Sequence, residues 1–457
     1  MPETPTTQPD PAGSRWWLVL LPLILLLALG LRLQAAASTP LNGDETDQYR
    51  AALVFRAALG SADGQDAPAG PLRVNHPLLA VFLIQAPLAT GFRSAFAVRL
   101  PFVVLSVVGL GFVYCLARLR FARAPALLGL LLLSVDQFHL IRSLTASEAV
   151  ALAFVPVILY VFARAVMRDR PNLMAIVGLL IGVGYFGKED VLLLTPALLL
   201  FLAARRSRHV WFRRKELYLG LVIAAGLVGV DVFFNLTGAT HNLSRIADRT
   251  AGVGVTLRAT SLYLGELLVR MVDDPVAFVW AQDRWSWEVP AMNWVAGLIC
   301  LTAAVQAVGR RRDDLTALLV WTFWVVFIVA SVVAPVHVFF ELDLKKWAGM
   351  SVVPAAILAG DLLHRRARGW RLGSLLLAVL LGYLIGNGVR ISRVRENVYS
   401  LPSEIIEMRG LVSTSPLPSG EGARMRRGRL LAGEGREGPA PAGCILPTAR
   451  RSVAHWL

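Results

Sequence analysis

Two adjacent carboxylates, Asp44 and Glu45, follow the first long apolar run of the sequence within a few residues: "WWLVLLPLILLLALGL" (16–31) leads to "LNGDETDQY" (41–49). A carboxylate at such a membrane boundary can act as a general base that takes a proton from an acceptor hydroxyl or amine. Carboxylate oxygens also suit a hard divalent cation such as Mg²⁺ or Mn²⁺. A solvated loop, or an N-cap for a helix starting near Asp47, accounts for the same residues without chemistry.

Basic side chains at other span boundaries are suited to binding a phosphate. His76 precedes Pro77 in "VNHPLLAVF" (74–82), where a helix N-terminus would favour an anion. Arg142, in "LIRSLTASEAVAL" (140–152), offers a planar fork of donors. Lys188, Lys345 and Lys346 offer point charges at the ends of apolar runs. The structural alternatives are a capping histidine, a hydrated turn and lysines that extend toward water.

Three further carboxylates accompany these cations: Glu148, Glu189 and Asp190. They are candidates for holding a metal ion or an acceptor, and the sequence leaves the identity and the presence of a metal open. Thr145 and Glu148 also fit the S/T-x-x-E capping box, which favours a capping role for Glu148. Glu189 and Asp190 would offset part of the charge of Lys188, as expected for a hydrated turn.

The composition of the chain indicates that helices in a membrane must position these residues. Of its 457 residues, 56% are hydrophobic and 17% are charged, whereas soluble domains average about 45–50% and 25%. Apolar windows of about 18 or more residues recur, which is long enough to cross the hydrocarbon core. The net charge of +15 comes from arginine clusters between the apolar runs, a pattern typical of cytoplasmic loops rather than of nucleic-acid binding.

We therefore predict an all-α, polytopic integral membrane protein with about 11 transmembrane helices. The candidate spans are 16–33, 99–117, 124–140, 146–166, 172–187, 190–204, 217–234, 291–309, 315–334, 347–363 and 371–389. The apolar stretch 76–92 is short and interrupted by Pro77 and Pro87, so we expect it to lie along the surface among interfacial helices. Only then do all later basic turns face the cytoplasm.

This topology predicts three regions. Residues 1–15 form a cytoplasmic N-terminal tail, and residues 16–390 form the transmembrane domain, with outer loops at 34–98 and 235–290. Residues 391–457 form an outer C-terminal segment rich in Gly, Pro and Arg, which we expect to be truncated or disordered. The candidate site residues then gather on the outer face of the cytoplasmic membrane.

The order of these motifs resembles that of the polytopic GT-C glycosyltransferases, in particular the dolichyl-phosphate-mannose-protein mannosyltransferase and aminoarabinose transferase-like group. After the acidic pair and His76-Pro77 come "FAVRLPFVVLSVVGLGFVYCLARLRF" (96–121), "SVDQFHLIRSLTASEAVALAF" (134–154) and "GLLIGVGYFGKEDVLLLTPALLLFL" (178–202). The resemblance covers residues 16–205, and more loosely 315–365.

The resemblance implies an enzyme that takes a sugar from a polyprenyl-phosphate-sugar donor and passes it to an acceptor glycan, lipid or protein. Asp44 matches the presumed base or acceptor-positioning carboxylate, while His76 and Lys188 would face the carrier phosphate. Lys345 and Lys346 stand where relatives often carry an Arg-Tyr pair, so the sequence departs from the pattern there. Some relatives need a divalent cation and others do not.

Two other classes stay open at this point. A polytopic transporter or lipid flippase would use the same carboxylates for a coupling ion or a headgroup, although transporters tend to carry internal repeats and midplane charges. A non-catalytic remnant of a transferase would fit the unusual composition after about residue 413.

Overall fold

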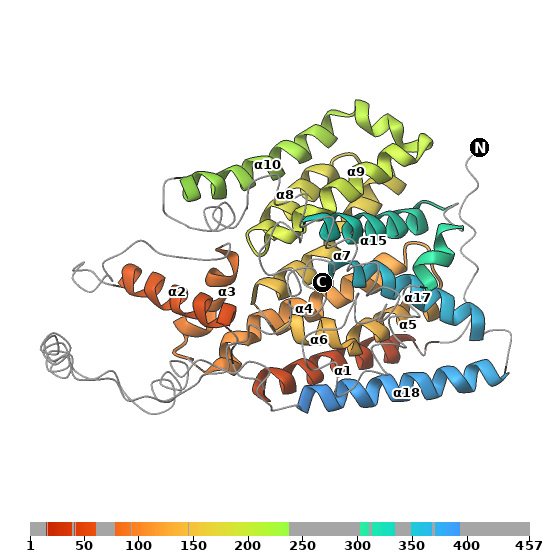
Figure 1. The fold of residues 1–457 in the computed structure, drawn as a ribbon, viewed down its shortest axis with the longest axis horizontal. Helices are drawn as coiled ribbons and strands as arrows, with labels where there is room; N and C mark the ends of the chain where they lie inside the picture. The colour runs from red at the N-terminus through yellow and green to blue at the C-terminus, as the bar shows by residue number, and fades with distance from the viewer. Residues whose placement is uncertain are drawn as a thin grey trace, which may run out of the picture. The chain divides into compact units, whose positions relative to one another are not determined.

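The computed structural model describes the greater part of the first 393 residues, all within one compact unit, Met1–Pro402. The described residues are 15, 17–38, 41, 43–60, 78–92, 94–144, 146–236, 302–309, 313–333, 349–367 and 371–393. Every regular element among them is a helix (Figure 1), so the predicted all-α class is confirmed.

The helices alternate in direction along the bundle. The α-helices are α1 (Trp17–Ser38), α2 (Gly43–Gly60), α3 (Leu79–Ala89), α4 (Ala95–Ala117), α5 (Arg123–Val135), α6 (Gln137–Arg142), α7 (Ala146–Met167), α8 (Leu173–Tyr185), α9 (Leu194–Ala204), α10 (Lys215–Leu236), α15 (Asp314–Val333), α17 (Val352–Ala367) and α18 (Arg371–Arg393). Short 3₁₀ helices are η1 (Glu189–Leu193), η2 (Arg206–Arg213) and η5 (Gly349–Ser351).

Four of the described helices are long and apolar enough to cross a membrane: Trp17–Ser38, Ala95–Ala117, Ala146–Met167 and Lys215–Phe233. Shorter apolar helices accompany them at Arg123–Val135, Leu173–Tyr185, Asp314–Val326 and Leu377–Gly386. Exposed leucine and valine side chains on α1 and α10 suit a surrounding of lipid. These helices support a multi-pass membrane protein, while the count of about 11 spans stays a prediction.

One predicted span, 124–140, is broken in the structure. Asp136 has an extended backbone (φ −60°, ψ 128°) between α5 and α6, and its Oδ2 accepts a hydrogen bond of 2.8 Å from the backbone N–H of His139. An Asp in this position caps the following helix instead of continuing the preceding one. The short helix α6 is therefore separately oriented and ends at Arg142.

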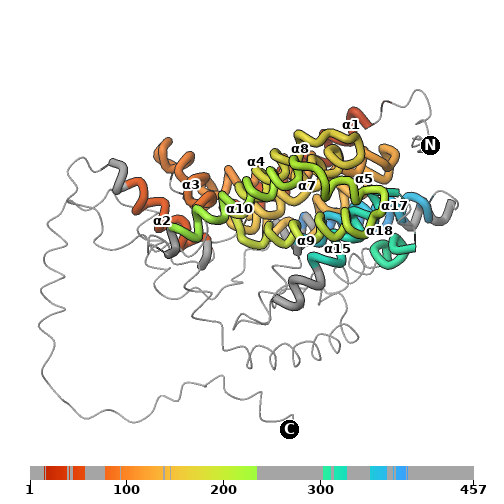
Figure 2. Tube along the Cα trace, turned by 90° about the horizontal axis from the view of Figure 1, so that it is seen from above, coloured from red at the N-terminus to blue at the C-terminus, as the bar shows by residue number. Residues whose placement is uncertain are grey.

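The first predicted outer loop contains two helices, α2 and α3, at one end of the bundle (Figures 1 and 2). They pack with the start of α4 and the start of α7 in a small hydrophobic cluster that includes Ala52, Ile84, Phe102 and Ala149. With 11 residues, α3 is far shorter than the roughly 20 needed for a span. That this pair lies in the membrane interface stays a prediction.

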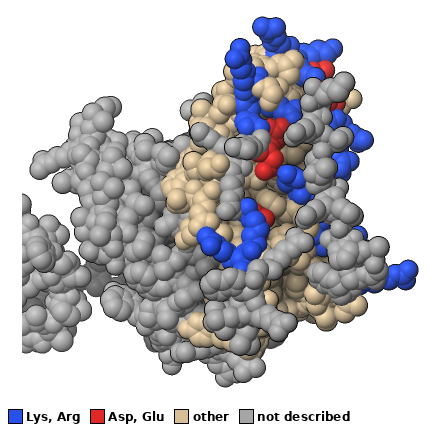
Figure 3. Space-filling view, turned by 90° about the vertical axis from the view of Figure 1, so that its right-hand side faces the viewer, with Lys and Arg blue, Asp and Glu red and all other residues tan. Residues whose placement is uncertain are grey.

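The basic turns lie together at the opposite end of the bundle, where Lys and Arg side chains gather (Figure 3). Contacts between turns distant in sequence join them, as alternating spans require: Arg120 Nε lies 4.0 Å from Asp313 Oδ1, Arg214 Nη2 lies 2.7 Å from Asp169 Oδ1, and Arg208 Nη1 donates to the Val166 carbonyl at 2.9 Å. Which side of a membrane this end faces stays a prediction.

A carboxylate clasp at the basic end makes stability depend on pH. Asp314 accepts hydrogen bonds from Arg205 and Arg208. Burial raises the pKa of the Asp314 carboxyl, but the two guanidinium groups outweigh this effect and hold the pKa below its ordinary value. Because the folded pKa is lowered, the clasp stabilises the fold above about pH 4, the ordinary value for Asp, and is lost as pH falls below it.

We expect Asp314→Asn to cost about 1.5–3 kcal/mol at pH 7, the range for hydrogen bonds to charged groups. Thermal unfolding in detergent should show a lower midpoint for the variant at pH 7 and a shrinking difference from wild type below about pH 4. A difference that stays constant down to pH 3 would contradict this account of the clasp.

Glycines allow α8 and α10 to approach each other closely. A Cβ on Gly220 would lie 2.4 Å from the Met174 carbonyl oxygen, and one on Gly178 would lie 1.9 Å from the Gly220 carbonyl oxygen. Small residues at such crossings are the usual basis of helix packing in membranes.

Gly220→Val should therefore force the two helices apart and destabilise the protein by about 1–3 kcal/mol, the usual cost of overpacking. Gly226→Val is the matched control, because a Cβ on this second α10 glycine meets nothing within 4 Å. Equal thermal midpoints for the two variants would refute the close-crossing explanation.

Candidate functional site

Arg142, Glu148 and Lys188, three of the predicted site residues, meet in the interior of the protein. Lys188 Nζ lies 3.5 Å from Glu148 Oε1, and Arg142 Nη1 lies 4.0 Å from the same oxygen. Each of the three residues is at most 4% exposed. Two cations thus share one buried carboxylate at distances longer than a hydrogen bond. We call these three residues the phosphate cluster.

Three segments converge to build the phosphate cluster. Arg142 ends α6, Glu148 lies in the first turn of α7, and Lys188 follows the end of α8. Gly187 makes the approach possible, since a Cβ there would lie 2.0 Å from Val150 Cγ1 on α7. The cluster therefore depends on an α7–α8 contact that a larger residue at 187 would disturb.

Glu148 takes a different role from the capping that its motif favoured. Its Oε2 accepts a hydrogen bond of 3.0 Å from Ser147 Oγ, and its Oε1 faces Lys188 and Arg142. Thr145, the other half of the capping motif, lies outside the described residues. Asp190 is buried in the neighbouring helix η1, and Glu189 is partly buried beside it, so both carboxylates adjoin Lys188 in the chain.

Helices α2 and α3 lie beside the phosphate cluster. Ala52 of α2 and Ala146 and Ala149 of α7 share one hydrophobic cluster, and Glu148 precedes Ala149 directly. The Leu79 N–H, at the start of α3, donates a hydrogen bond of 2.8 Å to the Phe186 carbonyl, two residues before Lys188. The segment that carries the acidic pair is therefore anchored against the segments that carry the basic residues.

Glu45 is engaged in a buried ion pair. Arg99 of α4 donates from Nε to Glu45 Oε1 at 2.8 Å and from Nη2 to Oε2 at 2.6 Å, and its Nη1 also donates to the Ala36 carbonyl at 3.3 Å. This two-pronged geometry is the strong form of a charge-assisted hydrogen bond. Glu45 therefore ties α2 to α4 and to the end of α1, which is a structural task.

The remaining predicted residues are described only in part or not at all. Asp44 lies in the first turn of α2, next to Glu45, and its side chain is outside the described structure. His76, Lys345 and Lys346 also lie outside the described residues. Their assignment to the site stays a prediction.

The sequence reading missed a second buried polar group, around Arg32 of α1. The Arg32 guanidinium is fully buried and donates to Ser106 Oγ at 2.9 Å, to the Ser134 carbonyl at 3.2 Å and to His139 Nδ1 at 2.7 Å. Because a guanidinium only donates, His139 accepts at Nδ1 and carries its proton on Nε2. An arginine inside an apolar run is costly and marks a specific partner, which was the available signal for both Arg32 and Arg99.

A third polar contact joins α8 to α10. Tyr185 donates from its hydroxyl to Asp231 Oδ2 at 2.7 Å, and Asp231 is 2% exposed. Asp231 interrupts an otherwise apolar helix, and the predicted span 217–234 contained it without remark. Among the described side chains, no three His, Cys, Asp or Glu residues come close enough to hold a metal ion, so the predicted divalent cation stays untested.

Comparison with known proteins gives relatives for this arrangement. Residues 75–232 match the family profile of the dolichyl-phosphate-mannose-protein mannosyltransferases. This range includes α3 to most of α10 and all three residues of the phosphate cluster. No curated protein sequence matches the chain.

Solved structures share the fold at low sequence identity. ArnT from Cupriavidus metallidurans bound to undecaprenyl phosphate has a TM-score of 0.52 and 15% identity, over 87% of this chain and 73% of that one. The apo form of the same protein gives 0.50 and 16%, over 80% and 63%. The archaeal oligosaccharyltransferase AglB from Archaeoglobus fulgidus, in complex with an inhibitory peptide and a dolichol-phosphate, gives 0.50 and 13% over 89% of this chain.

The chain spans 61% of the length of that archaeal oligosaccharyltransferase. At these identities the likeness shows the fold, and together with the family match it confirms the resemblance that the order of motifs indicated. The chain is a polytopic membrane protein of the GT-C superfamily, similar over residues 75–232 to the dolichyl-phosphate-mannose-protein mannosyltransferases.

Proposed function

We propose that this chain is a membrane glycosyltransferase that moves a sugar from a polyprenyl-phosphate-sugar donor to an acceptor. The observation that carries the proposal is the phosphate cluster, in which Arg142 and Lys188 are buried around Glu148. A structure that buries two cations together uses them for a specific anion or for a carboxylate, and here the carboxylate is held loosely. A donor phosphate would enter between these three groups.

The loose geometry of the phosphate cluster supports this role. The Glu45–Arg99 pair has two contacts of 2.8 Å or less, whereas the contacts of Glu148 with Lys188 and Arg142 are 3.5 and 4.0 Å. Polar groups of a catalytic site are often long-range before substrate binds and tighten in the complex. Phosphate oxygens can take the two cations at hydrogen-bond distance without breaking a tight ion pair.

Asp44 is the general base in this proposal. Glu45 is committed to Arg99, and successive residues of an α-helix are turned by about 100°, so Asp44 occupies a different position around α2. Carboxylate and phosphate cluster then stand on neighbouring elements, because α2 and the start of α7 share a hydrophobic cluster. His76, three residues before the anchored Leu79, and Lys345 and Lys346 complete the phosphate-binding set as proposals.

The reaction is a substitution at C1 of the sugar. An acceptor oxygen or nitrogen forms a bond to C1 while the bond from C1 to the phosphate oxygen breaks, and the electron pair leaves with the lipid phosphate. Asp44 takes the acceptor proton, and Arg142 and Lys188 stabilise the charge that develops on the leaving phosphate. In-line attack inverts the anomeric centre. We route no step through a metal ion.

The ligands of similar structures support this class of donor: one contains undecaprenyl phosphate and another contains a dolichol-phosphate together with a peptide. We propose that the acceptor is a glycan, lipid or protein. The site would face the outside of the cytoplasmic membrane, with the N-terminus and the basic end of the bundle on the cytoplasmic side.

The test compares Asp44→Asn with Asp47→Asn in the same helix, since Asp47 is exposed. Purified chains in nanodiscs are given radiolabelled polyprenyl-phosphate sugars, and the loss of sugar from the lipid is followed. Removing a general base should slow the reaction by about 10²–10⁴-fold in the first variant and leave the second unchanged. Equal rates for both variants would move the base away from Asp44.

A further inference from the structure

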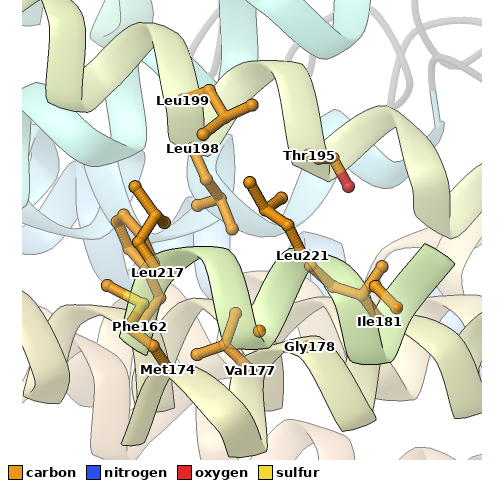
Figure 4. Close-up of a pocket in the computed structure, with 12 residues that line it drawn as sticks. Phe162, Met174, Val177, Gly178, Ile181, Thr195, Leu198, Leu199, Leu217 and Leu221 are labelled. Carbon is orange, nitrogen blue, oxygen red and sulfur yellow. The ribbon is translucent and has the colours of Figure 1, made fainter. Parts of the chain in front are cut away.

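An apolar cavity lies between α7, α8, α9 and α10 at the basic end, far from the phosphate cluster (Figure 4). Its wall includes Met174 and Gly178 from the first turns of α8, and Leu217 and Leu221 from the first turns of α10. The only hydroxyl in the lining is that of Thr195. A wall of this kind excludes charged or strongly polar ligands, because burying their polar groups without partners is costly, and it suits a hydrocarbon chain.

A dense group of cations stands where α10 begins, directly beside this cavity. The segment Arg205–Glu216 contains five arginines, one lysine and one acidic residue. Arg205, Arg208 and Arg214 are paired with Asp314 and Asp169. Arg206, Arg213 and Lys215 are exposed and enter none of the ion pairs found among the described residues.

The local structure holds these cations at the boundary of the apolar surface. Trp211 is fully buried, the Arg214 guanidinium lies 4.6 Å from its ring centre, and the Tyr218 hydroxyl donates to the Phe212 carbonyl at 2.7 Å. Just beyond, Leu219 and Val222 of α10 are 51% and 67% exposed. Fixed cations at the edge of an exposed apolar helix face match the headgroup level of a bilayer.

We propose that this place is a binding site for an anionic phospholipid. Arg213 and Lys215 hold the headgroup phosphate and its neighbouring negative charge, and one acyl chain enters the cavity past Leu217 and Leu221. The site is separate from that of the sugar donor, because it lies at the start of α8 whereas Lys188 follows the end of the same helix. The proposal does not rest on the transferase activity and is tested without it.

The test is native mass spectrometry of the full chain in detergent, with phosphatidylglycerol or phosphatidylcholine added. The chain should retain one phosphatidylglycerol in preference to phosphatidylcholine. Arg213→Gln and Lys215→Gln should each weaken this retention by about fivefold, the effect expected of one juxtamembrane cation. Leu221→Phe, or Leu199→Phe from α9, fills the cavity and should reduce retention of either lipid. Arg366→Gln, an exposed arginine at the end of α17, is the control and should change nothing.

Equal retention of the two lipids would overturn the proposal, as would equal losses in Lys215→Gln and Arg366→Gln. Retention that survives both cavity-filling variants would also overturn it, because only diffuse attraction to the basic surface would then remain. If Leu221→Phe instead abolishes retention of added undecaprenyl phosphate, the cavity belongs to the donor lipid and not to a phospholipid.

Discussion

Lys188→Met is expected to lower the rate of sugar release from a polyprenyl-phosphate sugar by about 10²–10³-fold, the usual cost of removing one group that stabilises developing negative charge. Lys188 is buried and lies 3.5 Å from Glu148 Oε1, so the methionine has a similar length but no charge. Lys188→Arg keeps the charge and should retain more activity than Lys188→Met. The measurement is the single-turnover rate with each variant in nanodiscs.

A structural role for Lys188 predicts a different pattern, which a second variant separates. Removing only the lysine leaves Glu148 with one cation fewer in a buried place, and this lowers stability. The double variant Lys188→Met/Glu148→Gln removes both charges and should recover the thermal midpoint. If the double variant also recovers the rate, Lys188 acts only through stability and the proposed phosphate contact is refuted.

Glu45→Gln is expected to destabilise the protein by about 3–5 kcal/mol, because breaking one partner of a buried ion pair leaves an uncompensated charge. The Glu45 and Arg99 side chains are each 3% exposed, so water cannot replace the lost partner. The thermal midpoint in detergent should fall well below that of Asp47→Asn, a surface substitution on the same helix with an expected effect within about 0.5 kcal/mol.

A double-variant cycle checks that the effect belongs to the Glu45–Arg99 pair. Glu45→Gln/Arg99→Met should be less destabilised than the sum of the single variants, because residues in contact are coupled. Additive effects would show that the two side chains stabilise the fold independently. The same cycle distinguishes Glu45 from Asp44, whose substitution should affect catalysis with little change in the midpoint.

Much of the fold could be predicted from the sequence because hydrophobic length is a strong local signal. Helices α1, α4, α7 and α10 fall where apolar runs of about 20 residues occur. Span ends are set by single residues: Asp136 caps α6 and divides one predicted span into two helices. Such a cap is visible in the sequence, but a run of leucines on one side outweighs it in any window average.

The site was predicted unevenly, for a physical reason. Lys188, Arg142 and Glu148 were recognised as ionisable groups at span ends, and they do come together. The partner of Glu45 is Arg99, 54 positions along the chain, and no local pattern identifies a contact of that range. Adjacent carboxylates look alike in sequence, so only the three-dimensional structure separates the one that holds a helix from the one that is available for chemistry.

The most direct test of the account is whether the chain removes sugar from a polyprenyl phosphate. The purified wild-type chain in nanodiscs is incubated with a panel of radiolabelled polyprenyl-phosphate sugars, and label on the lipid is measured over time beside a related, active transferase as a positive control. The account predicts that at least one donor loses its label, and that this loss is abolished in Asp44→Asn. Retention of label on every donor, with the control active, would contradict the transferase proposal and favour a transporter or a non-catalytic role.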